Sequence, residues 1–145
     1  MRQLPWLSLL IFWPLLAAAF LPLTRGDAPA CRRFALAAAL GELALAVLVA
    51  LLFAGHGSGL PVIEDLAWMP SLGIRYSLSM DGLSLVFVVL TALIGVCCTV
   101  ASRHDDAKRP ALYYALILAS LSTVQGIFLA SDLFLFALFW EAQLI

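Results

Sequence analysis

Residues 34–54 read FALAAALGELALAVLVALLFA, an apolar run that holds a single charged side chain, Glu42. A helix that crosses the hydrocarbon core of a bilayer needs about 20 consecutive apolar residues, and this run is long enough. Comparable runs occupy residues 4–23, 83–101 and 111–130. The whole chain is 64% hydrophobic and 12% charged, whereas soluble domains have roughly 45–50% apolar and 25% charged residues. A soluble chain of 145 residues could not hide this much apolar surface, so the sequence predicts an integral membrane protein.

The last residues, 131–145, read SDLFLFALFWEAQLI and predict a tight turn near Ser131–Asp132 followed by a fifth helix over 132–145. A helix of that length is about a third too short to span a bilayer. Its last carbonyl groups and the chain terminus would have no partners in hydrocarbon. We therefore expect an all-α membrane protein, a bundle of four full transmembrane helices plus the start of a fifth. Residues 1–145 are expected to form a single membrane domain, the amino-terminal part of a longer chain.

The connection over residues 55–81 differs from the others. Its first part, GHGSGLP (55–61), is rich in glycine, which favours the end of the preceding helix. Further along, LGIRYSLS (72–79) alternates apolar and polar residues, a pattern typical of a strand. We expect a short surface strand or hairpin in this outer loop. Asp81 follows and is well placed to cap the amino-terminus of the helix predicted over 83–101.

Basic residues predict the orientation of the helices. The connections 24–33 and 102–110 are rich in lysine and arginine, whereas the longer connection 55–81 holds only Arg75. By the positive-inside rule, the two basic connections are cytoplasmic, and the amino-terminus and residues 55–81 face outward. The basic residues that carry this argument are Arg25, Arg32, Arg33, Arg103, Lys108 and Arg109.

Glu141 interrupts the apolar run of the fifth predicted helix. About 10 residues from Ser131, at about 1.5 Å each, bring it about 15 Å deep, close to the middle of a hydrocarbon core about 30 Å thick. An ionisable group there costs on the order of 3 kcal/mol, so it is rarely without a function. A carboxyl group balanced between burial and a nearby cation can take up and release a proton, as a proton relay requires. The alternative is a neutral Glu141 that hydrogen-bonds between helices and only holds them together.

Three further polar residues are candidates for a polar pathway. Glu42 lies about 12 Å inside its helix, measured from the cytoplasmic end, and we expect it to reach a polar partner or water on that side. Ser122 and Gln125 are three positions apart and share one helix face. They either hydrate a half-channel near Glu141 or bond to a neighbouring helix. The sequence holds no phosphate loop, metal cluster or nucleophile motif, so we expect the chain itself to bind no cofactor and no metal. Nothing in its charge pattern indicates nucleic acid.

Two stretches carry a family resemblance: MPSLGIRYSLSMDGLSL (69–85) and GIFLASDLFLFALFWEAQLI (126–145). Together with the order of the segments, they resemble the amino-terminal third of subunit M of bacterial NADH:quinone oxidoreductase, the proton-pumping respiratory complex I. The mitochondrial counterpart is subunit 4. Antiporter-like subunits of cation/proton antiporters and of membrane-bound hydrogenases share this architecture and are the alternative. A truncated, non-transporting membrane scaffold is a second alternative.

The resemblance implies a function and a set of partners. It implies a multi-pass protein of the bacterial inner (cell) membrane that translocates protons while other subunits transfer electrons from NADH to quinone. NADH, flavin, iron–sulfur clusters and quinone are then expected in partner subunits, and the partners of this chain are other membrane subunits and lipid. The helix-five glutamate of the family falls on Glu141. In the family, that glutamate pairs with a lysine on a later helix, which residues 1–145 do not include. The chain is thus expected to be part of an enzyme but not catalytic alone.

Overall fold

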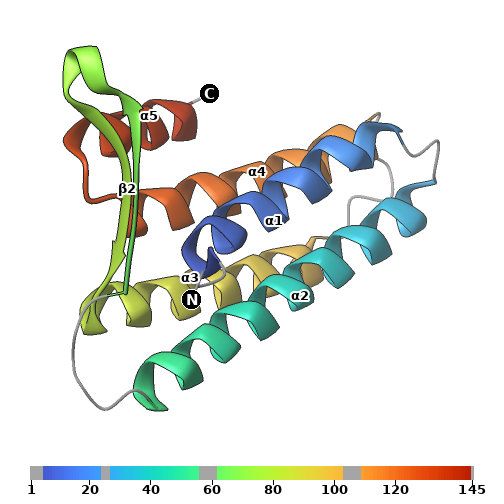
Figure 1. Cartoon of the computed structure of the whole chain (residues 1–145). Coiled ribbons are helices and arrows are strands. Elements are labelled where there is room, and N and C mark those ends of the chain that lie inside the picture. Colours follow the sequence, from blue (N-terminus) through green and yellow to red (C-terminus); the bar gives the residue numbers. More distant parts are fainter. Residues whose placement is uncertain (1–4, 24–26, 56–61, 103–108, 145) are drawn as a thin grey trace.

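The computed structural model of the chain describes residues 5–23, 27–55, 62–102 and 109–144. Within this part, five α-helices lie roughly side by side, and a two-stranded antiparallel sheet runs across one end of the bundle (Figure 1). The helices are α1 Trp6–Phe20, α2 Ala28–Gly55, α3 Gly82–Ala101, α4 Pro110–Leu129 and α5 Leu133–Gln143, and the strands are β1 Val62–Met69 and β2 Ile74–Met80. The predicted helical membrane bundle with a small hairpin is confirmed.

The helices differ in their reach across a membrane. Among the described residues, α2, α3 and α4 are long and apolar enough to cross one. Helix α1 is shorter than the predicted run, with 15 residues, and it continues into a 3₁₀ turn, Leu21–Leu23. At about 1.5 Å per α-helical residue and about 2.0 Å per 3₁₀ residue, the two together reach about 28 Å, close to the thickness of a hydrocarbon core.

Helix α2 begins earlier than the sequence pattern indicates, at Ala28 rather than at residue 34. The carbonyl oxygen of Asp27 accepts hydrogen bonds from the backbone N–H groups of the first turn, at 2.9 and 3.0 Å. Pro29 fits this turn because a first-turn N–H group needs no helical partner. The expected connection 24–33 is therefore shorter, and residues 24–26 lie outside the described part.

The two arginines expected in that connection lie instead on α2. The Arg32 Nη2 atom donates to the Val100 carbonyl oxygen near the end of α3, at 2.8 Å, and Arg33 Nε donates to the Pro29 carbonyl oxygen at 3.3 Å. Long basic side chains can keep their charge at the membrane surface while their stems cover apolar helix. Their contribution to the orientation argument is thus unchanged, whereas Arg25, Arg103 and Lys108 lie outside the described residues.

The hairpin pairs β1 with β2, from Val62 opposite Met80 to Met69 opposite Ile74, with an irregularity after Ala67. Gly73 closes its turn with a φ of 70°, in the left-handed region that favours glycine. The alternation predicted a strand over 72–79, and β2 confirms it. Strand β1 had no such signal, because two adjacent acidic residues break its alternation.

The hairpin is attached to the bundle at both of its sides. The Ser131 N–H group, in the turn between α4 and α5, donates to the Ser77 carbonyl oxygen of β2 at 2.9 Å. On the other strand, the Glu64 carboxylate accepts from the N–H groups of Leu7 and Ser8 at 2.7 and 3.0 Å, and from the Ser8 hydroxyl at 2.6 Å. Because α1 has no side-chain cap of its own, Glu64 takes that place from a strand distant in sequence.

Helices α3 and α5 carry their own caps. Asp81 accepts from the Ser84 N–H group at 2.7 Å, which confirms the expected cap and holds the pKa of this carboxyl below its usual value. Asp132 accepts from the N–H groups of Phe134 and Leu135 at 2.9 and 3.2 Å. Each carboxylate satisfies amide groups that the first helical turn leaves without partners.

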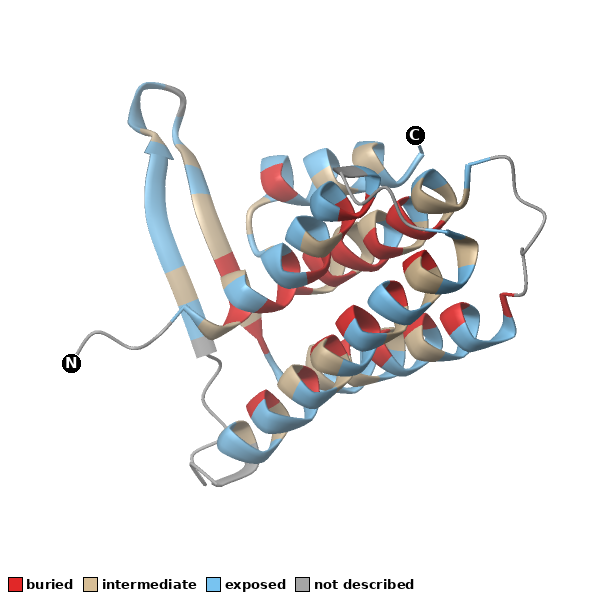
Figure 2. Ribbon diagram, turned by 90° about the vertical axis from the view of Figure 1, so that its right-hand side faces the viewer, coloured by how far each residue is buried: buried red, intermediate tan, exposed pale blue. Residues whose placement is uncertain are grey.

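Helix α4 is central and packs against α1, α2, α3 and α5. Figure 2 shows buried residues on the helix faces that turn toward one another, while the outer half of the hairpin is exposed. Buried apolar residues form two clusters. The cluster at the hairpin end contains Leu7, Leu10, Ile11, Ala46, Val49, Leu78, Met80, Val88, Ala92, Leu129 and Leu135. The cluster toward the opposite end contains Ala18, Leu21, Cys31, Ala35, Ala38, Tyr114, Ala115 and Leu118.

Candidate functional site

A buried polar layer separates the two apolar clusters. On α2, Glu42 falls between the residues of the first cluster and those of the second, and on α4 Ser122 and Gln125 do the same. All three side chains are buried. Polar groups in such a position need hydrogen-bond partners, because water is excluded and an unpaired group is costly.

Glu42 and Gln125 are partners across the bundle. The Gln125 Nε2 atom donates to Glu42 Oε1 at 3.2 Å and to the Val88 carbonyl oxygen of α3, also at 3.2 Å. One amide therefore links α4 to α2 and α3. Gln125 lies four residues before the end of α4, about 6 Å from the hairpin end. Because α2 begins at Ala28, Glu42 lies near the middle of this helix, and its partner Gln125 lies in the half of α4 nearer the hairpin.

Ser122 is engaged elsewhere. Its hydroxyl group donates to the Ile11 carbonyl oxygen of α1 at 2.6 Å. Of the two alternatives for the shared face, this geometry matches a bond to a neighbouring helix. Ser122 and Gln125 lie on the same helix, but their side chains bind different neighbours, so the structure does not join Ser122 to Glu42 or to Glu141.

Glu141 lies on the outer surface of the described chain. On α5, Phe139 packs against Gly126 of α4, and the Thr123 hydroxyl of α4 donates to the Gln143 side-chain oxygen. Positions 139 and 143 therefore face α4. Glu141 lies two residues from each, about 200° around a helix with 3.6 residues per turn, and so points away from α4.

The surroundings of Glu141 are apolar. The residue is exposed, and so are Leu138 and Leu144, its neighbours on the same helix face. Within the described ranges, no arginine forms an ion pair with it, and no side chain hydrogen-bonds to its carboxylate. Counting eight residues from the start of α5, its depth is about 12 Å from the hairpin end.

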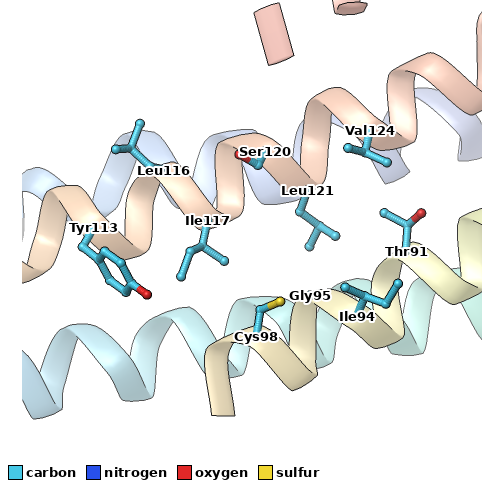
Figure 3. Close-up of a pocket in the computed structure, with 10 residues that line it drawn as sticks. All are labelled: Thr91, Ile94, Gly95, Cys98, Tyr113, Leu116, Ile117, Ser120, Leu121 and Val124. Atoms are coloured by element: carbon cyan, nitrogen blue, oxygen red, sulfur yellow. The ribbon is translucent and has the colours of Figure 1, made fainter. Parts of the chain in front are cut away.

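A groove lies between α3 and α4, with a volume of about 440 Å³ (Figure 3). Its lining is mostly aliphatic, and no acidic or basic side chain contributes to it; the lining residues are Thr91, Ile94, Gly95, Cys98, Tyr113, Leu116, Ile117, Ser120, Leu121 and Val124. Gly95 allows the helices to approach at one point, since a Cβ atom there would lie 2.9 Å from the Leu121 side chain. The groove suits apolar groups and offers no carboxylate or amine for proton transfer.

Sequence reasoning missed a second polar cluster, at the hairpin end of α1. Besides its bond to Glu64, the Ser8 hydroxyl lies 3.0 Å from the Tyr76 hydroxyl. Burial and the nearby Glu64 charge raise the pKa of Tyr76 above its usual value, although the bond to Ser8 lowers it in part. Ser8 lies 56 positions from Glu64 and 68 from Tyr76, so no local pattern could have predicted these contacts.

The chain has relatives of known name. No family model matches it. It is 37% identical, over 99% of its length, to NAD(P)H-quinone oxidoreductase chain 4 2 of Thermosynechococcus vestitus, and 35% identical, over 100% of its length, to the chloroplastic NAD(P)H-quinone oxidoreductase chain 4 of Chara vulgaris. These matches cover 27% and 30% of the two relatives. The chain thus spans little more than a quarter of the length of the relatives it matches.

Solved structures show the same fold. A chain of the membrane-bound sulfane sulfur reductase, an archaeal respiratory membrane complex, superposes with a TM-score of 0.76 at 21% identity, covering 95% of this chain and 21% of that one. A chain of the Mrp complex from Dietzia sp. superposes with a TM-score of 0.73 at 25% identity, covering 94% and 14%. The family resemblance predicted from the sequence is confirmed. Along essentially its whole length, the chain is homologous to part of the NAD(P)H-quinone oxidoreductase chain 4 family.

Proposed function

We propose that this chain contributes to proton translocation in an NAD(P)H:quinone oxidoreductase, as part of an antiporter-like membrane subunit in which Glu141 is a proton relay. The relatives support the complex, since their names make them chains of an NAD(P)H-quinone oxidoreductase. The observation that carries the role of Glu141 is its position. It is an exposed carboxylate on an otherwise apolar face of α5, inside the layer that the helices define.

The Glu141 carboxylate requires protein or water around it in place of lipid. A charged group at this depth costs on the order of 3 kcal/mol when lipid surrounds it. Ionisable residues in membrane helices therefore face protein or a water-filled cavity, where they pair with an opposite charge. We infer that protein covers this face of α5 and brings a cation to Glu141, as the lysine of a later helix does in the family that the chain resembles. A carboxylate beside a cation and water can pass a proton on.

The redox chemistry belongs to other subunits in this proposal. NAD(P)H, flavin, iron–sulfur clusters and quinone would bind there, and this chain would contact those subunits and the lipid. The described residues contain no group of three or more His, Cys, Asp or Glu side chains that could hold a metal. They therefore do not fit an iron–sulfur cluster, and no step of the proposal runs through one in this chain.

The proposed location is a bacterial inner membrane, with the amino-terminus outside and the basic connections in the cytoplasm. Cysteines introduced at two exposed residues, Asp27 directly before α2 and Ser71 in the turn of the hairpin, test the orientation in a variant without the native cysteines. A membrane-impermeant thiol reagent added to intact cells should label Ser71→Cys and leave Asp27→Cys unlabelled until the membrane is permeabilised. The opposite labelling would reverse the orientation.

The relay role is tested by Glu141→Gln in the full-length subunit within its complex. Glutamine keeps the size and most hydrogen bonds of glutamate but cannot titrate. Because a positioned proton-transfer group contributes about 10²–10⁴-fold to a rate, we expect proton pumping to fall by on the order of tenfold or more. The amount of assembled complex should stay near normal. Glu141→Asp should be intermediate, since the carboxylate is kept but withdrawn by one methylene group.

The competing role, a neutral link between helices, has the opposite signature. Glu141→Gln would then pump normally, and Glu141→Leu would assemble poorly because the hydrogen bond is lost. Normal pumping by an assembled Glu141→Gln complex would therefore refute the relay. The scaffold alternative predicts that no substitution at Glu141 changes pumping at all.

A further inference from the structure

The buried pair of Glu42 and Gln125 leaves two atoms without partners. Glu42 Oε2 and Gln125 Oε1 are both buried, and neither has a hydrogen-bond partner among the described residues. Both side chains are 0% exposed. An ionised carboxylate and an amide oxygen are both acceptors, so an ionised Glu42 cannot satisfy the second atom. Two buried acceptors without a donor are a costly arrangement.

No described charge compensates an ionised Glu42. Helix α1 carries no ionisable side chain, α3 carries only the exposed Cys97 and Cys98, and α4 carries only Tyr113 and Tyr114, about 16 Å along the helix from Gln125. The described arginines lie toward the ends of the helices or on the hairpin; they are Arg32, Arg33, Arg75 and Arg109. An isolated buried carboxylate is far more costly than a neutral carboxylic acid.

We propose that Glu42 holds a proton on Oε2 and donates it to Gln125 Oε1, so that the two side chains form a neutral, cyclic acid–amide pair. A single proton thus gives a hydrogen-bond partner to both unpaired atoms, Glu42 Oε2 and Gln125 Oε1. The existing bond from Gln125 Nε2 to Glu42 Oε1 closes the other half of the ring. The pair is a proton-binding site distinct from Glu141, and it does not depend on the proposed function.

This proton is structural, in contrast to one that is relayed. It stays between α2 and α4, and the same amide reaches the Val88 carbonyl oxygen of α3. The pair therefore ties three helices together by hydrogen bonds that a bilayer cannot replace with water. It also makes the polar layer between the two apolar clusters electrically neutral.

Infrared spectroscopy of the full-length protein in lipid nanodiscs tests the proposal. The difference spectrum between wild type and Glu42→Gln at neutral pH should contain the C=O band of a protonated, hydrogen-bonded carboxyl group, with an isotope shift in D₂O. A carboxylate band in its place would overturn the proposal, and would also identify the case in which water bridges an ionised Glu42 to Gln125.

Two further variants keep the test decisive. Gln125→Leu removes the acceptor, so the wild-type acid band should move to the higher frequency of a carboxyl group with fewer hydrogen bonds; an unmoved band would contradict the pair. Glu42→Gln should unfold at the same temperature as wild type and pump within about twofold of it, because its amide N–H group replaces the acid O–H group. A loss of pumping at unchanged stability would show that the proton at Glu42 moves, and would overturn its structural role.

Discussion

Glu42 and Glu141 are chemically identical side chains on helices of one bundle, yet their surroundings are opposite. Glu42 is enclosed and bound to Gln125, whereas Glu141 is exposed and has no partner within the described part of the chain. Helix α4 stands between them, since Gln125 faces α2 and the next residue, Gly126, faces α5. The comparison teaches that two carboxyl groups in the same membrane layer can have opposite surroundings, and that depth alone does not decide the role of either.

The largest stability effect is expected from removing the partner of Glu42. Gln125→Leu leaves a buried carboxyl group with no side-chain partner, and we expect a loss of about 1–3 kcal/mol in the free energy of unfolding. Measured on the 145-residue chain, in which its carboxylate has no described partner, Glu141→Leu is the matched control and should stay within about 0.5 kcal/mol. Denaturant titration of the purified protein measures both.

A double variant sharpens the same comparison. When both partners become apolar, as in Glu42→Leu with Gln125→Leu, no orphan group remains, and stability should return most of the way to that of wild type. Losses that simply add would mean that the two side chains do not act as a pair.

A smaller effect is expected at the contact that positions Glu141. A Cβ atom added at Gly126 would lie 2.5 Å from the Phe139 ring, and overpacking of this kind costs about 1–3 kcal/mol. Part of this is offset, because alanine is favoured over glycine within a helix by about 0.5–1 kcal/mol. Gly126→Ala should therefore displace α5 and reduce pumping, while the infrared band of Glu42 stays unchanged.

Gly95→Ala is the control for that substitution. The added atom would meet the flexible end of the Leu121 side chain at 2.9 Å, so the packing can adjust, and both pumping and stability should change less. Equal losses in the two alanine variants would show that the position of α5 does not control the behaviour of Glu141.

The smallest effect is expected at an exposed ion pair on the hairpin. Arg75 and Asp65 form an ion pair at 2.6 Å with side chains that are 56% and 38% exposed. The hydrogen bonds from Arg75 lower the pKa of Asp65 below its ordinary 3.8, so the pair stabilises the fold above that pH and loses its effect as the pH falls through the lowered pKa. Arg75→Ala should lower the unfolding temperature only slightly at neutral pH, and not at all in strong acid. A large difference that persists in acid would rule out the ion pair as its cause.

Much of the fold could be predicted because its signals are local. Apolar runs located α2, α3 and α4, and Asp81 marked the cap of α3 through its own neighbours. The predicted start of α2 was wrong because Arg32 and Arg33 indicated a loop. Their side chains instead bind carbonyl oxygens near the end of α3 and in the first turn of α2. Strand β1 depends on pairing with β2, which local alternation does not encode.

The candidate site was predictable only in part, because its contacts join distant positions. Glu42 and Gln125 were each noticed as polar residues in apolar helices, but the hydrogen bond between them spans 83 positions. Ser122 shares a helix face with Gln125 and still turns to α1. The direction in which Glu141 points follows from the packing of α5 against α4. That packing depends on the contact between Gly126 and Phe139, which no local sequence pattern predicts.

The Glu64 cap has a consequence for biosynthesis. Helix α1 receives the acceptor for its first N–H groups from Glu64, a residue made 57 positions after Leu7. Until β1 has been translated and has crossed to the same side of the membrane, the leading end of α1 is without this acceptor. Water can satisfy these N–H groups in the meantime, so what the hairpin completes is the capping of α1.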